Sequence, residues 1–376
     1  MAKRRKRPRP SSSPNKKRNK SQKMESDAVL CFQDVWKKHC SNNREEDETS
    51  YEEAVSNVFF ELANAPSVSY RLKAPPSIST SQNAEDTDES TTQQNTPTTT
   101  KSQISAITIK QDVSGAAQTH TGGIVWETSY LLLNYLLSST NWLSRNGERK
   151  TILEIGAGCG MLGLTLHKAL ELGIIGNEDD GNKAASRVII TETNEVMDNL
   201  RKNLERNYPS SSSDTSDSVI EKKSTKLHEL SVEELDWTRC EEDCARAKIK
   251  SRSVDCIVGT DVVFSTRFVR PMLETMKLLS HSRTIVYLCL QERCRDSHEL
   301  LLGEAIKYGF RIEDISEAVY NDLSLAHSCS FGRALECKLL KFTVVDTGND
   351  DRSEKKKSRK LKKEKKMKKS SSKKNW

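Results

Sequence analysis

Three glycines at alternate positions follow a short apolar segment in the stretch EIGAGCGMLG. Gly156, Gly158 and Gly160 carry no side chain, so the backbone can turn sharply there and approach a ligand closely. A second apolar segment, VIITE, ends at Glu192, whose carboxylate could accept hydrogen bonds from both hydroxyls of a ribose. A glycine turn with such an acid on the next strand predicts a site for a nucleoside-containing cofactor, which could be a nicotinamide dinucleotide or S-adenosylmethionine.

Glu154 and the rest of the sequence separate these two cofactor classes. Glu154, two residues before Gly156, would suit a ligand with an ammonium and a sulfonium and would repel a pyrophosphate. The seven histidines are scattered, and neither a catalytic histidine after a strand nor a Tyr-xxx-Lys pair for hydride transfer follows the glycine turn. We therefore predict S-adenosylmethionine, although Gly158, Gly160 and Gly163 also satisfy the dinucleotide pattern GxGxxG, which is weak evidence when it stands alone.

Alternating strands and helices are expected to hold these residues between 104 and 345. Strands are predicted over residues 106–112, 151–155, 187–192, 226–232, 255–264, 284–291, 309–316 and 336–345. Helices are predicted over residues 127–139, 161–172, 195–207, 267–279 and 297–309. Nearly continuous apolar strands joined by helices predict an α/β, doubly wound, mostly parallel sheet that is covered on both faces. The last two strands lack a helical crossover of normal length, so one of them should run antiparallel.

Composition divides the rest of the chain. Residues 26–75 form a predicted N-terminal extension, with a helix over 50–63 and a strand over 67–75. Two polar, Ser/Thr-rich stretches at 76–103 and 208–224 are predicted to be flexible insertions, the first of them disordered. The domain with the glycine turn is expected to cover residues 104–346.

The two ends of the chain carry most of its positive charge. The net charge is +7, but residues 1–23 carry +11 and residues 352–376 carry +12, which leaves about −16 for residues 24–351. Segments of this composition bury little, so residues 1–25 and 347–376 are predicted to be disordered basic tails. Such tails could direct nuclear import, or they could touch nucleic acid through its phosphates without reading sequence.

Cysteine spacing and hydropathy indicate the cellular compartment of the protein. Ten cysteines occur without a CxxC pair, which favours reduced thiols in an intracellular protein and predicts no metal site. The amino terminus is charged, so no secretory signal is expected, and the apolar run YLLLNYLL is too short to span a bilayer. We therefore predict a protein of the nucleus, the cytoplasm or both, without contact with a membrane.

Five segments, taken together, carry a resemblance to a known family. The segments THTGGIVWETSYLLLNYL, LEIGAGCGMLGL, ITETNEVMDNLRKNLERN, ELDWT and IVGTDVVF follow one another in order. They resemble the seven-β-strand protein-lysine methyltransferases, the non-SET group that includes the methyltransferase-like family 21 enzymes. The resemblance covers roughly residues 104–345 and implies a Rossmann-like methyltransferase sheet of seven strands, S-adenosylmethionine as cofactor and a protein substrate.

The resemblance also assigns roles to individual residues. It implies that the cofactor is bound by Trp126, Gly156, Ala157, Gly158, Glu192, Trp237 and Thr260. Asp261 and Phe264 match the acid and the aromatic residue that face the target amine. Phe264 departs from the family's usual tyrosine and lacks its hydroxyl, and one lost hydrogen bond is worth about 1 kcal/mol. The resemblance therefore implies that the chain methylates a protein side chain, above all the ε-amine of lysine. We expect Asp261 to orient that amine.

Two other classes of function remain open from the sequence. The same fold could methylate histidine, RNA or a small molecule, although DVVFST after the fourth strand lacks the proline-containing pattern of nucleic-acid methylases. Alternatively, Phe264 could mark a catalytically weakened adaptor that binds the cofactor and uses its basic tails to hold partners. Labelled cofactor in a cell extract separates an enzyme from an adaptor.

Overall fold

The computed structural model describes residues 29–40, 48–75, 103–112, 121–139, 142–143, 149–176, 185–209 and 227–345. The basic ends predicted over 1–25 and 347–376 lie outside the described residues, as does the insertion at 76–103 apart from Gln103. Of the second insertion, only Tyr208 and Pro209 are described. The predictions made for these segments stay predictions.

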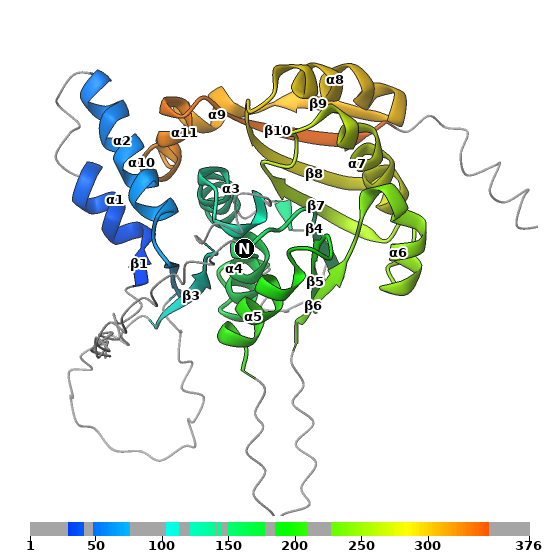
Figure 1. The fold of residues 1–376 in the computed structure, drawn as a ribbon, viewed down its shortest axis with the longest axis horizontal. Coiled ribbons are helices and arrows are strands. Elements are labelled where there is room, and N and C mark those ends of the chain that lie inside the picture. Colours follow the sequence, from blue (N-terminus) through cyan, green and yellow to red (C-terminus); the bar gives the residue numbers. More distant parts are fainter. Residues whose placement is uncertain are drawn as a thin grey trace, which may run out of the picture.

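A seven-stranded sheet forms the centre of the molecule, in the order β6-β5-β4-β7-β8-β10-β9 (Figure 1). Its strands are β4 (Lys150–Glu154), β5 (Ser186–Glu192), β6 (Glu229–Glu234), β7 (Val254–Thr260), β8 (Ser280–Gln291), β9 (Phe310–Asp314) and β10 (Cys337–Val344). Only β10 runs antiparallel to its neighbours, β8 and β9, while the other neighbouring strands pair in parallel. The prediction of a mostly parallel sheet of seven strands with one antiparallel strand is confirmed.

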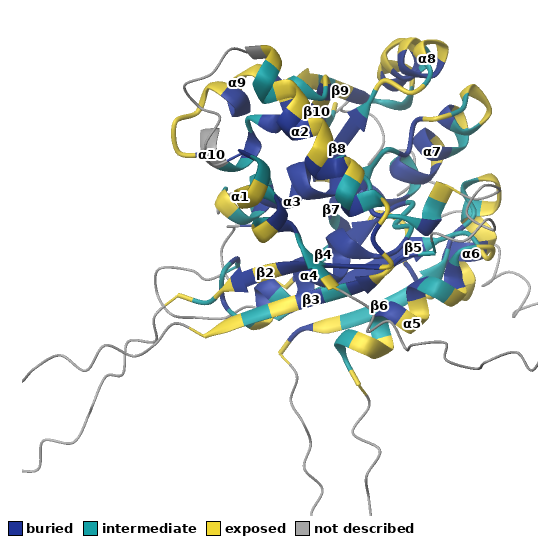
Figure 2. Cartoon of the chain, turned by 60° about the vertical axis from the view of Figure 1, so that its left-hand side comes forward, coloured by how far each residue is buried: buried dark blue, intermediate teal, exposed yellow. Residues whose placement is uncertain are grey.

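Helices cover both faces of this sheet because the strands are apolar on both sides. The helices are α3 (Glu127–Ser138), α4 (Met161–Glu171), α5 (Met197–Asn207), α6 (Cys240–Arg246), α7 (Thr266–Leu279) and α8 (Arg295–Ala305). Within β4, Ile152 belongs to the core formed with α3, α4 and α5, whereas the next residue, Leu153, belongs to the core formed with α6, α7 and α8. The sheet therefore lies as a buried layer between two helical layers (Figure 2).

A second sheet joins the N-terminal extension to the main domain. Its strands β1 (Val29–Cys31), β2 (Ser67–Lys73) and β3 (Ile104–Lys110) lie in the order β1-β2-β3, with α1 (Phe32–Cys40) and α2 (Glu48–Ala63) alongside (Figure 1). The ring of Phe32 stacks on Tyr130 of α3 at 4.5 Å between centroids, so the extension shares the core of the main domain. The strand predicted at 106–112 exists as β3, but it pairs with β2 and not with the seven-stranded sheet.

The predicted strand over 255–264 is too long. The strand β7 ends at Thr260, and Asp261 has a φ of 49°, which a strand does not accommodate. Val262 and Val263 are nevertheless buried, so the apolar pattern that suggested a longer strand reflects the core beneath a loop. This turn aims the residues after β7 at the edge of the sheet where ligands bind in such folds.

Several elements were not predicted from the sequence. They are β1, α1 and α6, together with η2 (Thr121–Gly123), η4 (Trp237–Arg239), α9 (Ser316–Asn321), α10 (Ala326–Cys329) and α11 (Phe331–Ala334). The 3-10 helix η5 (Ile306–Tyr308) falls within the predicted helix 297–309. The connection from β9 to β10 consists of α9, α10 and α11 and contains no full crossover helix, which accounts for the antiparallel β10. All ten cysteines are free thiols. Within the described part of the chain, no helix combines the length and the apolar character needed to cross a bilayer.

Replacing each of two helical glycines with alanine should change the stability of the fold in opposite directions. A Cβ added at Gly163 in α4 would lie 2.7 Å from Cγ1 of Ile190 and would also meet the carboxylate of Glu154, whereas one added at Gly303 in α8 would meet nothing within 4 Å. We expect Gly163→Ala to destabilise the fold by about 1–3 kcal/mol through overpacking. Gly303→Ala should stabilise it by up to about 1 kcal/mol. Urea unfolding followed by circular dichroism measures both, and an equal effect at the two sites would contradict the packing seen at α4.

Candidate active site

A cavity of about 800 Å³ opens at the carboxyl ends of β4, β5 and β7. This is the point where the strand order reverses, because the chain runs outward from β4 to β6 and then returns to β7 on the other side. Ligands of open α/β sheets bind at such a switch point, since the loops diverge there and leave a crevice. The cavity is lined by residues from η2, α3, the glycine turn, β5, η4, β7 and the loop before α7.

The glycine turn after β4 forms one wall of this cavity. Gly156 and Gly158 have φ values of 60° and 54°, in the left-handed region that favours glycine. A Cβ added at Gly158 would lie 3.3 Å from the carbonyl oxygen of Gly122, and one added at Gly156 would lie 2.9 Å from Val262. The backbone conformation therefore requires glycine at both positions, and the close approach of η2 at Gly158 and of Val262 at Gly156 leaves little room for a side chain.

Glu192, at the end of β5, links its strand to the glycine turn. Its Oε2 accepts a hydrogen bond from the backbone N–H of Gly158 at 2.7 Å, and its Oε1 accepts one from the N–H of Thr193 at 2.8 Å. Burial raises the pKa of Glu192, and these two backbone donors oppose that effect. Each carboxylate oxygen can accept a further bond. Because Glu192 also lines the cavity, it is suited to accept hydrogen bonds from a pair of ribose hydroxyls.

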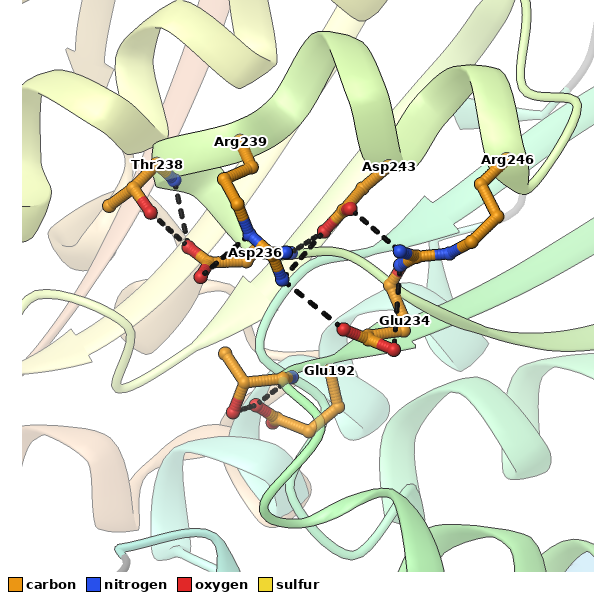
Figure 3. Close-up of polar contacts among 8 residues, drawn as sticks. Glu192, Glu234, Asp236, Thr238, Arg239, Asp243 and Arg246 are labelled. Atoms are coloured by element: carbon orange, nitrogen blue, oxygen red, sulfur yellow. Dashed lines mark hydrogen bonds and ion pairs between the residues drawn. The ribbon is translucent and has the colours of Figure 1, made fainter.

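A network of acids and arginines fixes the loop after β6 (Figure 3). This loop carries Trp237. Oδ1 of Asp236 accepts hydrogen bonds from the backbone N–H and the hydroxyl of Thr238, and the N–H of Asp236 donates to the buried Asp243 at 2.8 Å. Arg239 reaches Glu234 at 3.4 Å, and Arg246 pairs with Asp243 at 3.0 Å. This bracing keeps the ring of Trp237 against Gly156, where it forms a flat apolar wall.

Asp261 marks the other end of the cavity. Its Oδ1 accepts a hydrogen bond from the backbone N–H of Gln291 at 2.8 Å, and its Oδ2 lies 3.1 Å from Nη2 of Arg293. Burial raises the pKa of Asp261, while Gln291 and Arg293 lower it. Thr260, the preceding residue, is held by a hydrogen bond between its hydroxyl and that of Ser129 at 3.0 Å.

Aromatic side chains surround the entrance beside Asp261. The ring of Phe264 is 41% exposed and lies 5.6 Å from that of Phe268 on the first turn of α7. Phe268 in turn packs edge-on against Trp237, with 6.3 Å between the ring centroids. The exposed ring of Phe264 and the half-buried ring of Phe268 therefore give the cavity an apolar surface near a carboxylate.

All nine residues predicted for the site line this one cavity. They are Trp126, Gly156, Ala157, Gly158, Glu192, Trp237, Thr260, Asp261 and Phe264. The structure thus brings them together, while the role predicted for each stays a prediction. Other lining residues were not predicted, among them Gly122, Ser129, Asp236, Arg267 and Phe268. Two of these carried a signal in the sequence, because Asp236 precedes Trp237 in ELDWT and Phe268 lies in the predicted helix that follows Phe264.

The role that the sequence analysis gave Glu154 is wrong. Glu154 is 2% exposed, it does not line the cavity, and its Oε2 accepts a hydrogen bond from the N–H of Gly163 at 2.9 Å. Burial raises its pKa to about 8, so at neutral pH the side chain is mostly uncharged. Glu154 therefore supports the start of α4 and offers no charge to a cofactor. Strand alternation explains the error, because Glu154 points into the core under the turn.

This buried acid predicts a pH dependence of stability. The pKa of Glu154 in the folded state is about 8, whereas an exposed glutamate titrates near 4.3. Its contribution to stability is therefore complete below about pH 4 and is lost as the pH rises through about 8. We expect Glu154→Gln, whose amide oxygen can still accept from Gly163, to gain stability relative to the wild type between about pH 5 and pH 8, by up to a few kcal/mol.

Thermal unfolding by circular dichroism at several pH values measures this effect. Glu299→Gln, on the exposed side of α8, is a matched control that should leave the pH dependence unchanged. A stability difference between E154Q and the wild type that stays constant with pH would show that Glu154 is not a buried neutral acid.

The fold and this site define a class of protein. A doubly wound sheet of seven strands with a single antiparallel strand, a glycine turn and a ribose-binding acid at the switch point describe a nucleoside-dependent transferase of the methyltransferase type. The residues fit S-adenosylmethionine: glycines leave room beside η2, Glu192 can hold a ribose, and Trp237 offers a flat wall. Among the described residues, no cluster of three or more His, Cys, Asp or Glu side chains could hold a metal ion.

Comparison with known proteins identifies the family. The model of the lysine methyltransferase family matches residues 101–302, so this chain belongs to that family. It is an S-adenosylmethionine-dependent protein-lysine methyltransferase, as the sequence analysis expected.

The chain is similar to curated relatives and to solved structures. It is 27% identical over 209 residues to the protein N-lysine methyltransferase METTL21A of Xenopus tropicalis, covering 56% of this chain and 76% of that protein. It is 26% identical over 199 residues to the protein-lysine methyltransferase METTL21E of Mus musculus, covering 52% of this chain and 66% of that protein. A crystal structure of TYW2 from P. horikoshii in complex with MeSAdo matches with a TM-score of 0.34 and 15% identity, covering 64% of this chain and 69% of that one.

Proposed function

We propose that this protein transfers a methyl group to the ε-amine of a lysine that enters the cavity between Asp261 and Phe264. One observation supports this most strongly. A carboxylate and an exposed aromatic ring, those of Asp261 and Phe264, both line the cavity from the loop after β7. A long side chain with an apolar stem and a basic tip fits that combination, because the rings can pack on the stem while the acid meets the amine.

Cofactor binding falls to the other part of the cavity in this proposal. Glu192 would hold the ribose, Gly156, Ala157 and Gly158 would lie against the methionine moiety and the ribose, and Trp126 and Trp237 would flank the cofactor. Thr260 would border it. When bound, S-adenosylmethionine supplies a methyl group on a sulfonium, which an amine lone pair can accept.

The chain's own residues have to present a neutral, correctly placed amine. A lysine has a pKa near 10.4, so roughly one in two thousand side chains is neutral at pH 7. An apolar entrance disfavours the ammonium, and the rings of Phe264 and Phe268 supply such an entrance. Asp261, which is held by Gln291 and Arg293, orients the amine through a hydrogen bond and does not serve as a strong base. Most of the acceleration then comes from positioning.

Phe264 fits this scheme without a hydroxyl. Its ring supplies the apolar wall, and the loss of one hydrogen bond relative to tyrosine is worth about 1 kcal/mol. The substitution therefore bears on the rate or on the choice of substrate, and does not by itself remove the reaction.

The experiment is the transfer of a labelled methyl group into a cell extract. We expect the purified protein to label a protein band that resists nuclease and disappears with protease, and mass spectrometry should find the label on a lysine. A label found on RNA or on histidine would show that the acceptor is not lysine. An absence of any label, together with measurable binding of S-adenosylhomocysteine, would favour an adaptor.

We also propose that the basic ends direct the protein to the nucleus. This proposal depends on sequence alone, on the charges of +11 in residues 1–23 and +12 in residues 352–376. A fluorescent fusion tests it: replacing the basic residues of 3–9 with glutamine should shift the protein toward the cytoplasm. An unchanged distribution combined with loss of RNA binding would instead assign these ends to non-specific contact with nucleic acid.

A further inference from the structure

Three segments of the chain converge on the guanidinium of Arg293, beside the acceptor end of the cavity. Nη2 of Arg293 lies 2.7 Å from Oε1 of Glu127 and 3.1 Å from Oδ2 of Asp261. Its guanidinium carbon lies 4.6 Å from the centre of the Trp126 ring. Trp126 and Glu127 begin α3, Asp261 follows β7, and Arg293 follows β8, so the cluster joins three loops at the same edge of the sheet.

Arg293 contacts two side chains of the cavity without lining it. Within the described part of the chain, Trp126 and Asp261 line the cavity, whereas Arg293 and Glu127 do not. The Arg293 side chain is 35% exposed, so it lies at the surface of the molecule beside these two residues. We therefore expect its influence on the acceptor to pass through Trp126 and Asp261.

The charges in the cluster make this arginine necessary. The side chain of Asp261 is 6% exposed and that of Glu127 is 14% exposed, and a carboxylate with so little water needs a cation or several donors to stay ionised. Burial raises the pKa of Asp261, Gln291 and Arg293 lower it, and Glu127 raises it.

Two cysteines, Cys289 on β8 and Cys337 on β10, also face this acid. Burial raises the pKa of both thiols, so they stay neutral and leave Arg293 as the cation of the cluster that contacts Asp261 among the described residues.

We propose that Arg293 is a positioning residue of the acceptor site, whose guanidinium holds the carboxylate of Asp261 and the ring of Trp126 in place for the target amine. The inference rests on the proposed function and extends it to a residue outside the cavity. Arginine suits the task because its planar group stacks on a ring while its N–H groups reach two carboxylates, which lysine does not do equally well. One guanidinium between two carboxylates also leaves one negative charge, which favours a basic side chain as it enters.

The first test compares Arg293→Met with the wild type across pH. Without the guanidinium, the pKa of Asp261 should rise further, so the carboxylate is lost at a higher pH. We expect R293M to transfer label to the extract protein about tenfold more slowly near neutral pH, since small misplacements cost up to about 100-fold. The ratio of its rate to the wild-type rate should fall further as the pH is lowered from about 9 to about 5.5.

A second variant should change the pH dependence of the relative rate in the opposite direction. Glu127→Gln keeps the size of the side chain and an acceptor for Arg293, but it removes a charge that raises the pKa of Asp261. The ratio of its rate to the wild-type rate should therefore rise toward low pH. Circular dichroism shows whether R293M folds. If it does not fold, E127Q still tests the proposal. Arg293→Lys should recover part of the lost rate, because it restores the charge without the stacked plane.

Arg333→Met is the matched control. Arg333 also pairs with a glutamate, at 2.6 Å from Glu317, and its guanidinium carbon also lies over a ring, 5.8 Å from the centre of Tyr320, but it does not line the cavity. Its rate and pH profile should match those of the wild type.

The outcomes separate the inference from the proposed function. A wild-type protein that labels no protein at any pH contradicts the proposed function, and the inference falls with it. If the wild type is active, ratios for R293M and E127Q that do not change with pH overturn the inference alone. So does a loss of affinity for S-adenosylhomocysteine in R293M as large as its loss of rate, because the effect of Arg293 would then pass through Trp126 and the cofactor and not through Asp261. Opposite slopes for the two variants, with a loss of affinity smaller than the loss of rate, support it.

Discussion

Asp261→Asn is expected to lower the rate of methyl transfer by about 100-fold or more while leaving the affinity for S-adenosylhomocysteine within about threefold of the wild type. The amide has the size of the carboxylate, so packing against the end of β8 is retained. It loses the charge that pairs with Arg293 at 3.1 Å and the acceptor capacity that would orient an amine. The loss should therefore appear in the rate, with little change in cofactor binding.

The measurement combines label transfer into the extract protein with calorimetry of S-adenosylhomocysteine. Asp322→Asn is a matched control outside the cavity, because Oδ1 of Asp322, like that of Asp261, accepts a hydrogen bond from a backbone N–H. In Asp322 the same oxygen also accepts one from the hydroxyl of Ser324. D322N should transfer label at the wild-type rate. Undiminished methyl transfer by D261N would refute the orienting role of Asp261 and would mean that another lining residue orients the amine.

Glu192→Ala should mainly lower the affinity for the cofactor, whereas Asp261→Asn should mainly lower the rate of methyl transfer. A hydrogen bond to a charged group is worth about 1.5–3 kcal/mol, and each 1.4 kcal/mol is a factor of ten in affinity. Two bonds to ribose hydroxyls therefore imply a rise of the dissociation constant by about 100-fold or more. The variant also removes the acceptor that holds the N–H of Gly158 at 2.7 Å, so the glycine turn loses its link to β5.

Calorimetry with S-adenosylhomocysteine tests this expectation directly. Glu195→Gln provides the comparison, because Glu195 is an exposed acid that also lines the cavity and its change removes the same charge. Its effect should stay below about fivefold, since an exposed charge is screened by water. Similar losses in E192A and E195Q would mean that general charge, and not a specific carboxylate, governs binding.

Much of the fold could be read from local patterns. The near-continuous apolar runs at 151–155 and 187–192 required strands buried on both faces, and the helical spacing in 195–207 required an amphipathic helix. These patterns are local, so the mostly parallel sheet and its antiparallel strand followed from them, whereas the number of seven strands came from the resemblance to a known family. The ends of strands were less predictable. Val262 and Val263 belong to the core although they lie in a loop, and their apolar character is the same as that of a buried strand.

The candidate site was predictable where a residue's chemistry follows from its place in a motif. Glycines after a strand and an acid at the end of the next strand must meet at one edge of a parallel sheet, which is why Gly158 and Glu192 are in contact. The direction of a single side chain was less predictable. Glu154 has the right charge and spacing for a cationic cofactor, but the pleat of β4 turns it into the core.

The sequence by itself determined the order of most strands and helices, the position of the glycine turn and the acid that it meets, because these depend on periodicity and on glycine's backbone freedom. The other site residues, such as Asp261 and Trp237, were predicted from the resemblance to a known family. Only the tertiary structure decided that β3 pairs with β2, that Glu154 is a buried support for α4, and that Arg293 lies between Glu127 and Asp261. Arg293 and Glu127 are separated by 166 positions in the chain. No local pattern records such a contact, since it exists only once α3, β7 and β8 end at the same edge of the folded sheet.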